Sequence, residues 1–198
     1  MGVKLVSASG GSVEINPPAT ASNFVATMPA GTGTVAVNGV SGTLVSGTAV
    51  ASTSGTSIDF TGIPSWVKRI TVMFNGVSTN GTSNVQIQLG TSGGVETTSY
   101  LSVTSILNTA SISTGSAATT GFVLYTQVNA AYTLTGNAVF TLISSPSWTG
   151  TASTIRSDGL GFFNAGSKTL SGTLDRVRIT TVNGTDTFDA GSINILYE

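Results

Sequence analysis

Residues 85–89 read Val85-Gln86-Ile87-Gln88-Leu89 and alternate strictly between apolar and polar side chains. Successive side chains of a β-strand point to opposite faces, so this alternation predicts a half-buried strand with its glutamine amides in solvent. Residues 121–125 and 138–143 are more continuously apolar, which predicts central strands. Residues 67–74 and 192–197 alternate again, so strand-like segments extend through this whole region.

Turn residues separate these segments. Asn75-Gly76 and Asn80-Gly81 are strong turn signals. Asp158-Gly159 and Ser171-Gly172 each lie between two strand-like runs, which predicts two hairpins. Many short strands at this spacing favour an all-β fold, and we expect a jelly-roll-like β-sandwich over residues 56–198.

The composition agrees with strands and excludes disorder. The 198 residues include 27 Ser, 33 Thr and 25 Gly, and only 8% are charged, against roughly a quarter in an ordinary soluble domain. Disordered chains combine low hydrophobicity with high net charge, whereas this chain is 39% hydrophobic with a net charge of −1. We therefore expect a packed core beneath a surface of hydroxyl and amide groups.

Several functional classes are disfavoured. The seven basic residues form no broad cationic stripe, although Lys68-Arg69 and Arg176 with Arg178 are two small groups, so we expect no nucleic-acid partner. No apolar run approaches the roughly 18 residues of a membrane span, and the N-terminus lacks a signal-peptide core, so we expect no membrane insertion. The chain has no Cys and no His, which removes disulfides, thiolate chemistry and the usual zinc ligands. We expect neither a cofactor nor a metal.

The N-terminal part is organised differently. In residues 1–38, the strand candidates Val3–Val6 and Val13–Ile15 flank a Ser9-Gly10-Gly11 turn, and Pro17-Pro18 ends the ladder because proline has no N–H to donate. A unit this small rarely folds alone, so we expect its own oligomer or another protein to order it. Residues 39–55 repeat Ser-Gly-Thr, which is typical of a flexible linker or of a narrow β stalk wound with two other copies.

Two stretches resemble a known family. Residues 57–90, SIDFTGIPSWVKRITVMFNGVSTNGTSNVQIQLG, closely resemble the opening of a C-terminal domain that recurs in tail-fibre-like and other virion proteins of tailed bacteriophages and prophages. Residues 9–37, SGGSVEINPPATASNFVATMPAGTGTVAV, resemble an element that attaches short fibres to phage particles. Together they cover about a third of the chain. The first match is the more specific, since the second consists mainly of small and turn residues.

This resemblance implies a non-enzymatic, homotrimeric fibre on the virion surface, with an N-terminal anchor, a short stalk and a β-sandwich tip that adheres to bacterial surface polysaccharide. The partner of the anchor is a capsid or a tail protein, and the lack of a long shaft favours a short appendage. The alternatives are a capsid-decorating protein without receptor binding, a free bacterial carbohydrate-binding module and a glycan-cleaving enzyme. The anchor candidates are Val13, Ile15, Pro17, Pro18, Phe24 and Met28.

Aromatic side chains are the candidates for glycan contacts, because the apolar C–H faces of sugar rings pack on aromatic rings. Trp66 and Trp148 each follow a Pro-Ser pair in a loop-like context, and Tyr100, Tyr125 and Tyr132 would add polar-tipped rings. For Trp66 we favour a place in the core or in a trimer contact. For Trp148 an exposed loop and the core are equally compatible with the sequence.

Acidic residues offer two further sites. Some glycosidases use paired carboxylates, but we expect Asp175, next to Arg176, to form a cross-strand or neighbouring ion pair. We expect Asp158 to belong to a turn and Asp59 to cap or pin the Gly62-Ile63-Pro64 turn. Residues 183–189 gather oxygen ligands that suit calcium, although a hairpin turn with Asx hydrogen bonds is the preferred interpretation.

Two arginines form the last candidate site. Arg176 and Arg178 alternate on one strand, so they point the same way and would suit the phosphates of lipopolysaccharide. We favour a solvated face, or pairing with acids across a trimer interface.

Overall fold

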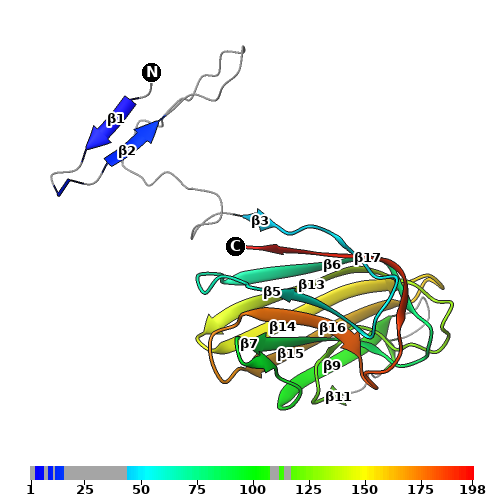
Figure 1. The fold of residues 1–198 in the computed structure, drawn as a ribbon. Coiled ribbons are helices and arrows are strands. Elements are labelled where there is room, and N and C mark those ends of the chain that lie inside the picture. The colour runs from blue at the N-terminus through cyan, green and yellow to red at the C-terminus, as the bar shows by residue number, and fades with distance from the viewer. Residues whose placement is uncertain (1–2, 7–8, 11, 16–43, 108–111, 114–116) are drawn as a thin grey trace, which may run out of the picture. The chain divides into compact units, whose positions relative to one another are not determined.

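The structure, a computed structural model, describes residues 3–6, 9–10, 12–15, 44–107, 112–113 and 117–198. The chain forms two compact units, Met1–Val35 and Ala36–Glu198. All regular elements in the described ranges are β-strands (Figure 1). No helix long and apolar enough to cross a membrane occurs among them.

In the first unit, β1 (Val3–Val6) and β2 (Ser12–Ile15) form an antiparallel hairpin with Val3 opposite Ile15. Gly10 has a φ of 88°, which glycine adopts without steric cost in a tight turn. The two predicted strands are therefore confirmed. Two of the anchor candidates, Val13 and Ile15, lie on β2, and the others lie outside the described residues, namely Pro17, Pro18, Phe24 and Met28.

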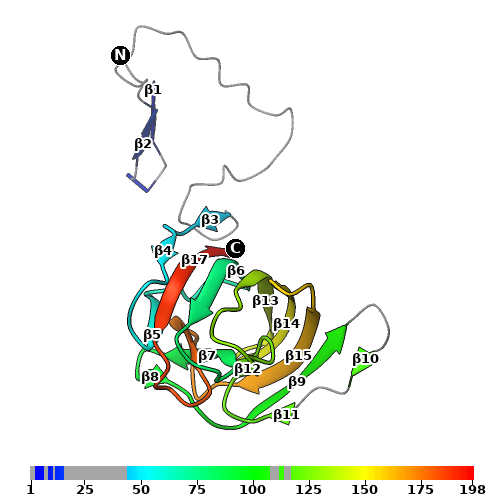
Figure 2. The ribbon, with the colours of Figure 1, turned by 90° about the vertical axis from the view of Figure 1, so that its right-hand side faces the viewer.

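The second unit consists of two antiparallel sheets (Figures 1 and 2). The large sheet has the order β10-β9-β15-β14-β13-β6-β17-β3, with β11 on β9 and β4 on β17, and the small sheet has the order β12-β7-β16-β5, with β8 on β7. The strands are β3 (Val45–Ser46), β4 (Val50–Ala51), β5 (Ser57–Thr61), β6 (Arg69–Thr79), β7 (Val85–Thr91), β8 (Gly94–Val95), β9 (Tyr100–Leu107), β10 (Ile112–Ser113), β11 (Ala117–Ala118), β12 (Phe122–Val123), β13 (Leu134–Ser144), β14 (Ser147–Arg156), β15 (Gly161–Thr169), β16 (Arg176–Thr181) and β17 (Phe188–Tyr197).

The two sheets face each other and enclose one hydrophobic core, as a β-sandwich requires. Phe122 from the small sheet packs edge-on against Phe140 from the large sheet, with ring centroids 4.9 Å apart. A Cβ on Gly150 would lie 2.6 Å from the Phe140 ring, so β14 needs glycine where this ring crosses it. The largest fully buried side chains are Tyr125, Phe122, Phe140, Phe162, Phe188, Ile70, Ile87, Leu89, Leu124, Leu134, Ile179 and Ile193.

Several predicted strands are confirmed. On β6, Val72 and Phe74 are buried on the face opposite the exposed Arg69. On β17, Ile193 and Ile195 share the inner face. Strands β14 and β15 form the predicted hairpin around Asp158-Gly159. Alternation identified these elements because each has one face in the core and one in solvent.

The prediction of a central strand at residues 121–125 is wrong. Only Phe122–Val123 pairs, as the edge strand β12 on β7. The carbonyl oxygen of Val123 accepts hydrogen bonds from Thr104 Oγ1 at 2.5 Å and Asn164 Nδ2 at 2.9 Å, and that of Leu124 accepts one from Thr154 Oγ1 at 3.2 Å. Side chains of the large sheet, rather than a second strand, therefore satisfy this buried backbone.

Two turn predictions are also wrong. Ser171-Gly172 does not close a hairpin, because β15 belongs to the large sheet and β16 to the small one, so the chain crosses between sheets there. Asn75-Gly76 lies inside β6, where the pairing with β17 shifts register. Gly76 has a φ of 62°, and a bulge accommodates this conformation as readily as a turn does.

The glutamine amides of β7 are not in solvent, contrary to the prediction. Gln86 and Gln88 are 2% and 5% exposed. Gln88 Nε2 donates to the Thr120 carbonyl at 2.8 Å, and Thr120 Oγ1 donates to Gln86 Oε1 at 3.0 Å. The chain before β12 therefore covers this face and supplies the partners that buried amides need.

Part of the predicted stalk or linker pairs with the sandwich. Strands β3 and β4, from residues 45–51, are antiparallel to β17, with Ser46 opposite Leu196 and Val50 opposite Ile193. The described part of residues 39–55 thus extends one side of the large sheet.

Candidate functional site

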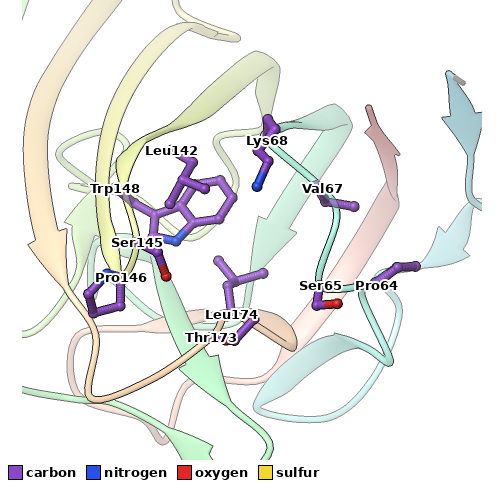
Figure 3. A pocket seen from close by; sticks show the side chains of 10 residues that line it. All are labelled: Pro64, Ser65, Val67, Lys68, Leu142, Ser145, Pro146, Trp148, Thr173 and Leu174. Carbon is purple, nitrogen blue, oxygen red and sulfur yellow. The ribbon is translucent and has the colours of Figure 1, made fainter. Parts of the chain in front are cut away.

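Trp148 lies on β14 and is 3% exposed, so it does not occupy an exposed loop. Its ring forms one wall of a small pocket at the end of the sandwich, hereafter the end pocket, with a volume of about 90 Å³ (Figure 3). The loop before β6, the β13–β14 connection and the β15–β16 crossover surround it. The lining residues are Pro64, Ser65, Val67, Lys68, Leu142, Ser145, Pro146, Trp148, Thr173 and Leu174.

Trp66 and Tyr132 are half-buried, and each has a neighbour against its ring. Trp66 packs on Tyr197 with centroids 6.0 Å apart and a tilt of 52°. The Arg156 guanidinium lies over the Tyr132 ring, 4.7 Å from its centroid. Each ring is therefore engaged on at least one face. Trp66 packs against the margin of the core, which is one of the two placements favoured for it.

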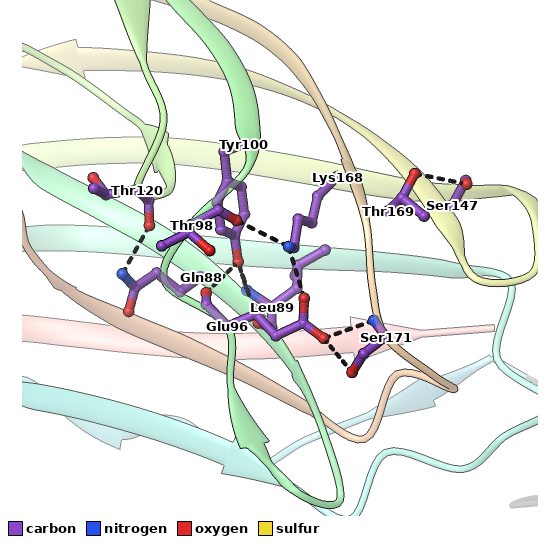
Figure 4. Close-up of polar contacts among 10 residues, drawn as sticks. All are labelled: Gln88, Leu89, Glu96, Thr98, Tyr100, Thr120, Ser147, Lys168, Thr169 and Ser171. Carbon is purple, nitrogen blue, oxygen red and sulfur yellow. Dashed lines mark hydrogen bonds and ion pairs between the residues drawn. The ribbon is translucent and has the colours of Figure 1, made fainter.

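Tyr100 belongs to the core, so its prediction as a glycan contact is wrong. Its Oη accepts the Leu89 N–H at 2.8 Å and donates to the Glu96 carbonyl at 2.8 Å (Figure 4). Burial is the main cause that raises the pKa of Tyr100 above its ordinary value. The phenol therefore links β7 to β9 as a neutral hydrogen-bonding group.

A buried lysine completes this network. Lys168 Nζ lies 2.7 Å from Glu96 Oε2, donates to the Thr98 carbonyl at 2.9 Å and sits over the Tyr100 ring (Figure 4). Glu96 Oε1 accepts hydrogen bonds from the N–H and the hydroxyl of Ser171, each at 2.8 Å. Burial alone would raise the pKa of Glu96, but the bonds from Lys168 and Ser171 outweigh burial and lower it. The ion pair therefore joins β15 to the segment between β8 and β9, and the Ser171 bonds fasten the β15–β16 crossover to the same carboxylate.

The two arginines of β16 pair within the chain. Arg176 meets Asp175 at 3.0 Å, as predicted, and Arg178 makes a bidentate pair with Asp59 at 2.7 Å. Hydrogen bonding to Asp59 is the main cause that raises the pKa of Arg178. Asp59 therefore does not pin the turn at residues 62–64. The Ile63 N–H of that turn donates instead to the backbone carbonyl of Asp175.

The outer face of the small sheet is consequently polar, and both of its arginines have an acidic partner within the chain. Arg178 lies between Asp59 on β5 and Gln88 on β7 in register. A groove of about 370 Å³ runs over this face, and hydroxyl and amide side chains line most of it. Arg178 already donates two hydrogen bonds to the Asp59 carboxylate, so its positive charge is compensated within the chain. The groove therefore offers no unpaired charge to a ligand.

The loop at residues 183–189 is the predicted Asx turn. Asn183 Oδ1 accepts the N–H groups of Thr185 and Asp186 at 3.0 and 3.2 Å, and Asn183 Nδ2 donates to Asp186 Oδ1. In the part of the chain that the structure describes, no three acidic, histidine or cysteine side chains gather closely enough to hold a metal ion. The loop is closed by its own hydrogen bonds.

The feature that the sequence prediction missed is the outward face of β9, β15, β14 and β13, hereafter the open face. These strands carry two charged residues, Arg156 and Lys168, and both are 4% exposed because they point into the core. The outward side chains are apolar, hydroxyl or amide groups, and Val103, Ala165, Thr151 and Val139 form one row across the four strands.

Large apolar side chains stand exposed on the open face. Leu101 is 73% exposed, Val103 48%, Phe163 52% and Ile155 52%. A groove of about 350 Å³ lies on this face, between the side chains of Val103, Phe163 and Asn137. One signal could have revealed this face, because residues 97–155 contain no Asp, Glu, Lys or Arg.

Comparisons with known proteins found no match. No protein-family model matches it, and searches of curated proteins and of solved structures find no significant similarity. The link to tailed-phage virion proteins therefore rests on the resemblance of residues 9–37 and 57–90.

Proposed function

We propose that the chain is a non-enzymatic structural fibre protein of a tailed phage particle. In this proposal it is a homotrimer on the virion surface, its N-terminal segment attaches to a capsid or tail protein, and its sandwich is the distal tip. Three tips on one fibre convert weak contacts with bacterial surface polysaccharide into useful avidity. A capsid-decorating role without receptor binding is the alternative use of the same assembly.

The open face carries this proposal. A soluble monomer usually interrupts its surface with charges and avoids large exposed apolar patches. Here the outward side chains of four adjacent strands carry no charge, and Phe163 is 52% exposed at the centre. Apolar and hydroxyl rows are self-complementary, so another copy of the same chain can cover this face without desolvating any ion.

Other features disfavour the alternative classes. A free carbohydrate-binding module would present an aromatic platform, but Trp148 and Tyr100 are buried and Trp66 and Tyr132 each pack against a neighbour. A glycosidase needs two carboxylates that are free to act on one substrate. Five acids each pair with a cation, namely Asp59, Glu96, Asp158, Asp175 and Glu198. The other two acids of the sandwich accept hydrogen bonds within the chain, Asp186 from Ser83 and Asn183, and Asp189 from Ser78.

Nested strand pairing supports the jelly-roll-like class of the tip. Strand β6 pairs with β17, β7 with β16 and β9 with β15. A jelly roll is a long antiparallel hairpin rolled into two sheets, and such a roll joins early strands to late strands in this nested order.

Light scattering on the purified full chain tests the proposal. We expect a mass of three times the 19.8 kDa chain. Val103→Glu places a carboxylate beside the groove of the open face, where burial without a partner is costly, so we expect it to shift the mass toward one chain.

Val128→Glu is the matched control. Val128 is 60% exposed in the loop between β12 and β13, away from the open face, so the same substitution there should leave the trimer intact. A monomeric wild-type chain would refute the self-assembling fibre. Equal effects of the two substitutions would refute the open face as the contact.

A further inference from the structure

The end pocket has an unusual set of polar groups. Its side-chain lining contains one ammonium, Lys68, one indole N–H, Trp148, and three hydroxyls, Ser65, Ser145 and Thr173. No carboxylate lines it. The remaining side chains are apolar, from prolines, leucines and Val67. Such a lining favours an anion attached to a carbon-rich group.

Lys68 differs from the other cations of the sandwich. Arg69, Arg156, Lys168, Arg176 and Arg178 each have an acidic partner within 3.0 Å. Among the described side chains, Lys68 is the cation without an ion pair, and Figure 3 shows its side chain at the pocket, near Trp148 and Val67. Its charge is therefore available to a ligand.

Trp148 supplies the second donor. The residue is 3% exposed, and its indole nitrogen lies toward Ser145 and Leu174 in the pocket (Figure 3). In the described part of the chain this N–H has no hydrogen-bond acceptor, and its nitrogen is not fully buried, so it is open to the pocket. A ligand oxygen in the pocket would satisfy it.

Charge and size select the class of anion. A single ammonium balances one negative charge, whereas a phosphate monoester carries about two near neutral pH and would leave charge uncompensated beside the apolar lining. A volume of about 90 Å³ admits a small group rather than a whole sugar ring. A carboxylate on a sugar ring that stays at the pocket mouth meets both limits.

We propose that the end pocket binds the carboxylate group of an acidic sugar, with Lys68 as its counter-ion and the Trp148 indole as a hydrogen-bond donor. This inference deepens the adhesive part of the proposed function and rests on it, but it does not require the trimer. It names hexuronate-containing polysaccharide as the class of surface that the sandwich contacts.

Nitrogen-15 transverse-relaxation-optimised NMR of the full chain gives a direct readout, because the protein has two Trp residues. We expect glucuronate to shift the Trp148 indole resonance saturably, while glucose at the same concentration leaves it unchanged. Acetate, sulfate and inorganic phosphate are the other probes. The Trp66 resonance, identified by Trp66→Phe, is the internal reference.

Variants assign the binding to the pocket. Lys68→Gln should weaken glucuronate binding at least about tenfold, because a hydrogen-bonded charge is lost, while Lys68→Arg should retain most of it. Arg69→Gln is the matched control, because the neighbouring Arg69 pairs with Glu198 and does not line the pocket.

Four outcomes would overturn the inference. They are no saturable shift with glucuronate, equal shifts with glucose, equal affinity for acetate, sulfate or phosphate, and an unchanged affinity in Lys68→Gln. The light-scattering result is independent of this titration. A trimer that ignores glucuronate removes only the carboxylate site, whereas a monomer that binds glucuronate removes only the fibre.

Discussion

Asn164→Ala should destabilise the sandwich strongly, although the residue has no apolar bulk to lose. Asn164 lies on β15, is 4% exposed and approaches four oxygens with its Nδ2 atom. These are the Ser102 hydroxyl at 2.9 Å, the Val103 carbonyl at 3.1 Å, the Thr104 hydroxyl at 3.2 Å and the Val123 carbonyl at 2.9 Å. It thereby ties β9 and β15 of the large sheet to β12.

The expected magnitude follows from the number of bonds. An amide nitrogen has two hydrogens, so two of the four contacts are hydrogen bonds at any moment. Two buried bonds contribute about 1–3 kcal/mol, and the space left by the side chain adds to this, so we expect a loss of about 2–4 kcal/mol. For a domain of this size the melting temperature should fall by roughly 4–16 °C.

Urea and thermal unfolding of the full chain, at one fixed protein concentration, measure this loss. Asn75→Ala is the matched control, because Asn75 lies on β6 of the same sheet, outside the open face, and is exposed with no side-chain hydrogen bond in the described part of the chain. It should change the free energy of unfolding by less than about 0.5 kcal/mol. Equal small losses in both variants would refute the role given to Asn164.

Two further predictions concern charge and backbone. The pKa of Glu96 is lowered in the folded chain from its ordinary 4.5, so its contribution to stability is complete above that pH and is lost as pH falls through the lower folded value. Glu96→Gln should flatten this part of the stability–pH curve in acid-unfolding experiments, and an unchanged curve would contradict the pairing with Lys168. Gly191 and Gly159 have nearly equal φ values, +90° and +89°. They differ in the space around them, because a Cβ on Gly191 would lie 2.4 Å from the Gly76 carbonyl oxygen, whereas a Cβ on Gly159 would have no atom within 4 Å. Gly191→Ala should therefore cost several kcal/mol more than about the 1 kcal/mol expected of Gly159→Ala, and equal melting temperatures would show that the backbone near Gly191 yields to the added carbon.

Local sequence was sufficient where a strand has one buried and one exposed face. The alternation in β6 and β17 identified both strands and their inward residues, since side-chain direction has a period of two that neighbours in sequence reveal. The Asp158-Gly159 hairpin was equally accessible, because a tight turn joins strands that are also adjacent in space. The composition alone was enough to exclude chemistry that depends on Cys or His, because the chain has neither residue.

Contacts between distant residues decided the rest. Gln86 and Gln88 look like solvent-facing amides until Thr120 covers them. Residues 121–125 look like a central strand until donors from three other strands take its carbonyls. In each case the alternative partner lies tens of residues away, where sequence spacing carries no information about pairing.

The candidate sites divide in the same way. The sequence by itself determined that the chain is strand-rich, uncharged over residues 97–155 and without metal-binding or thiol side chains. Only the tertiary structure decided that Trp148 forms a wall of the end pocket and that Arg178 forms an ion pair with Asp59. It also decided that Lys68 lies at this pocket without an ion pair among the described side chains. Whether a charged side chain has a partner depends on which strands lie next to each other. Pairing between distant segments sets that strand order, so the sequence around each residue does not reveal it.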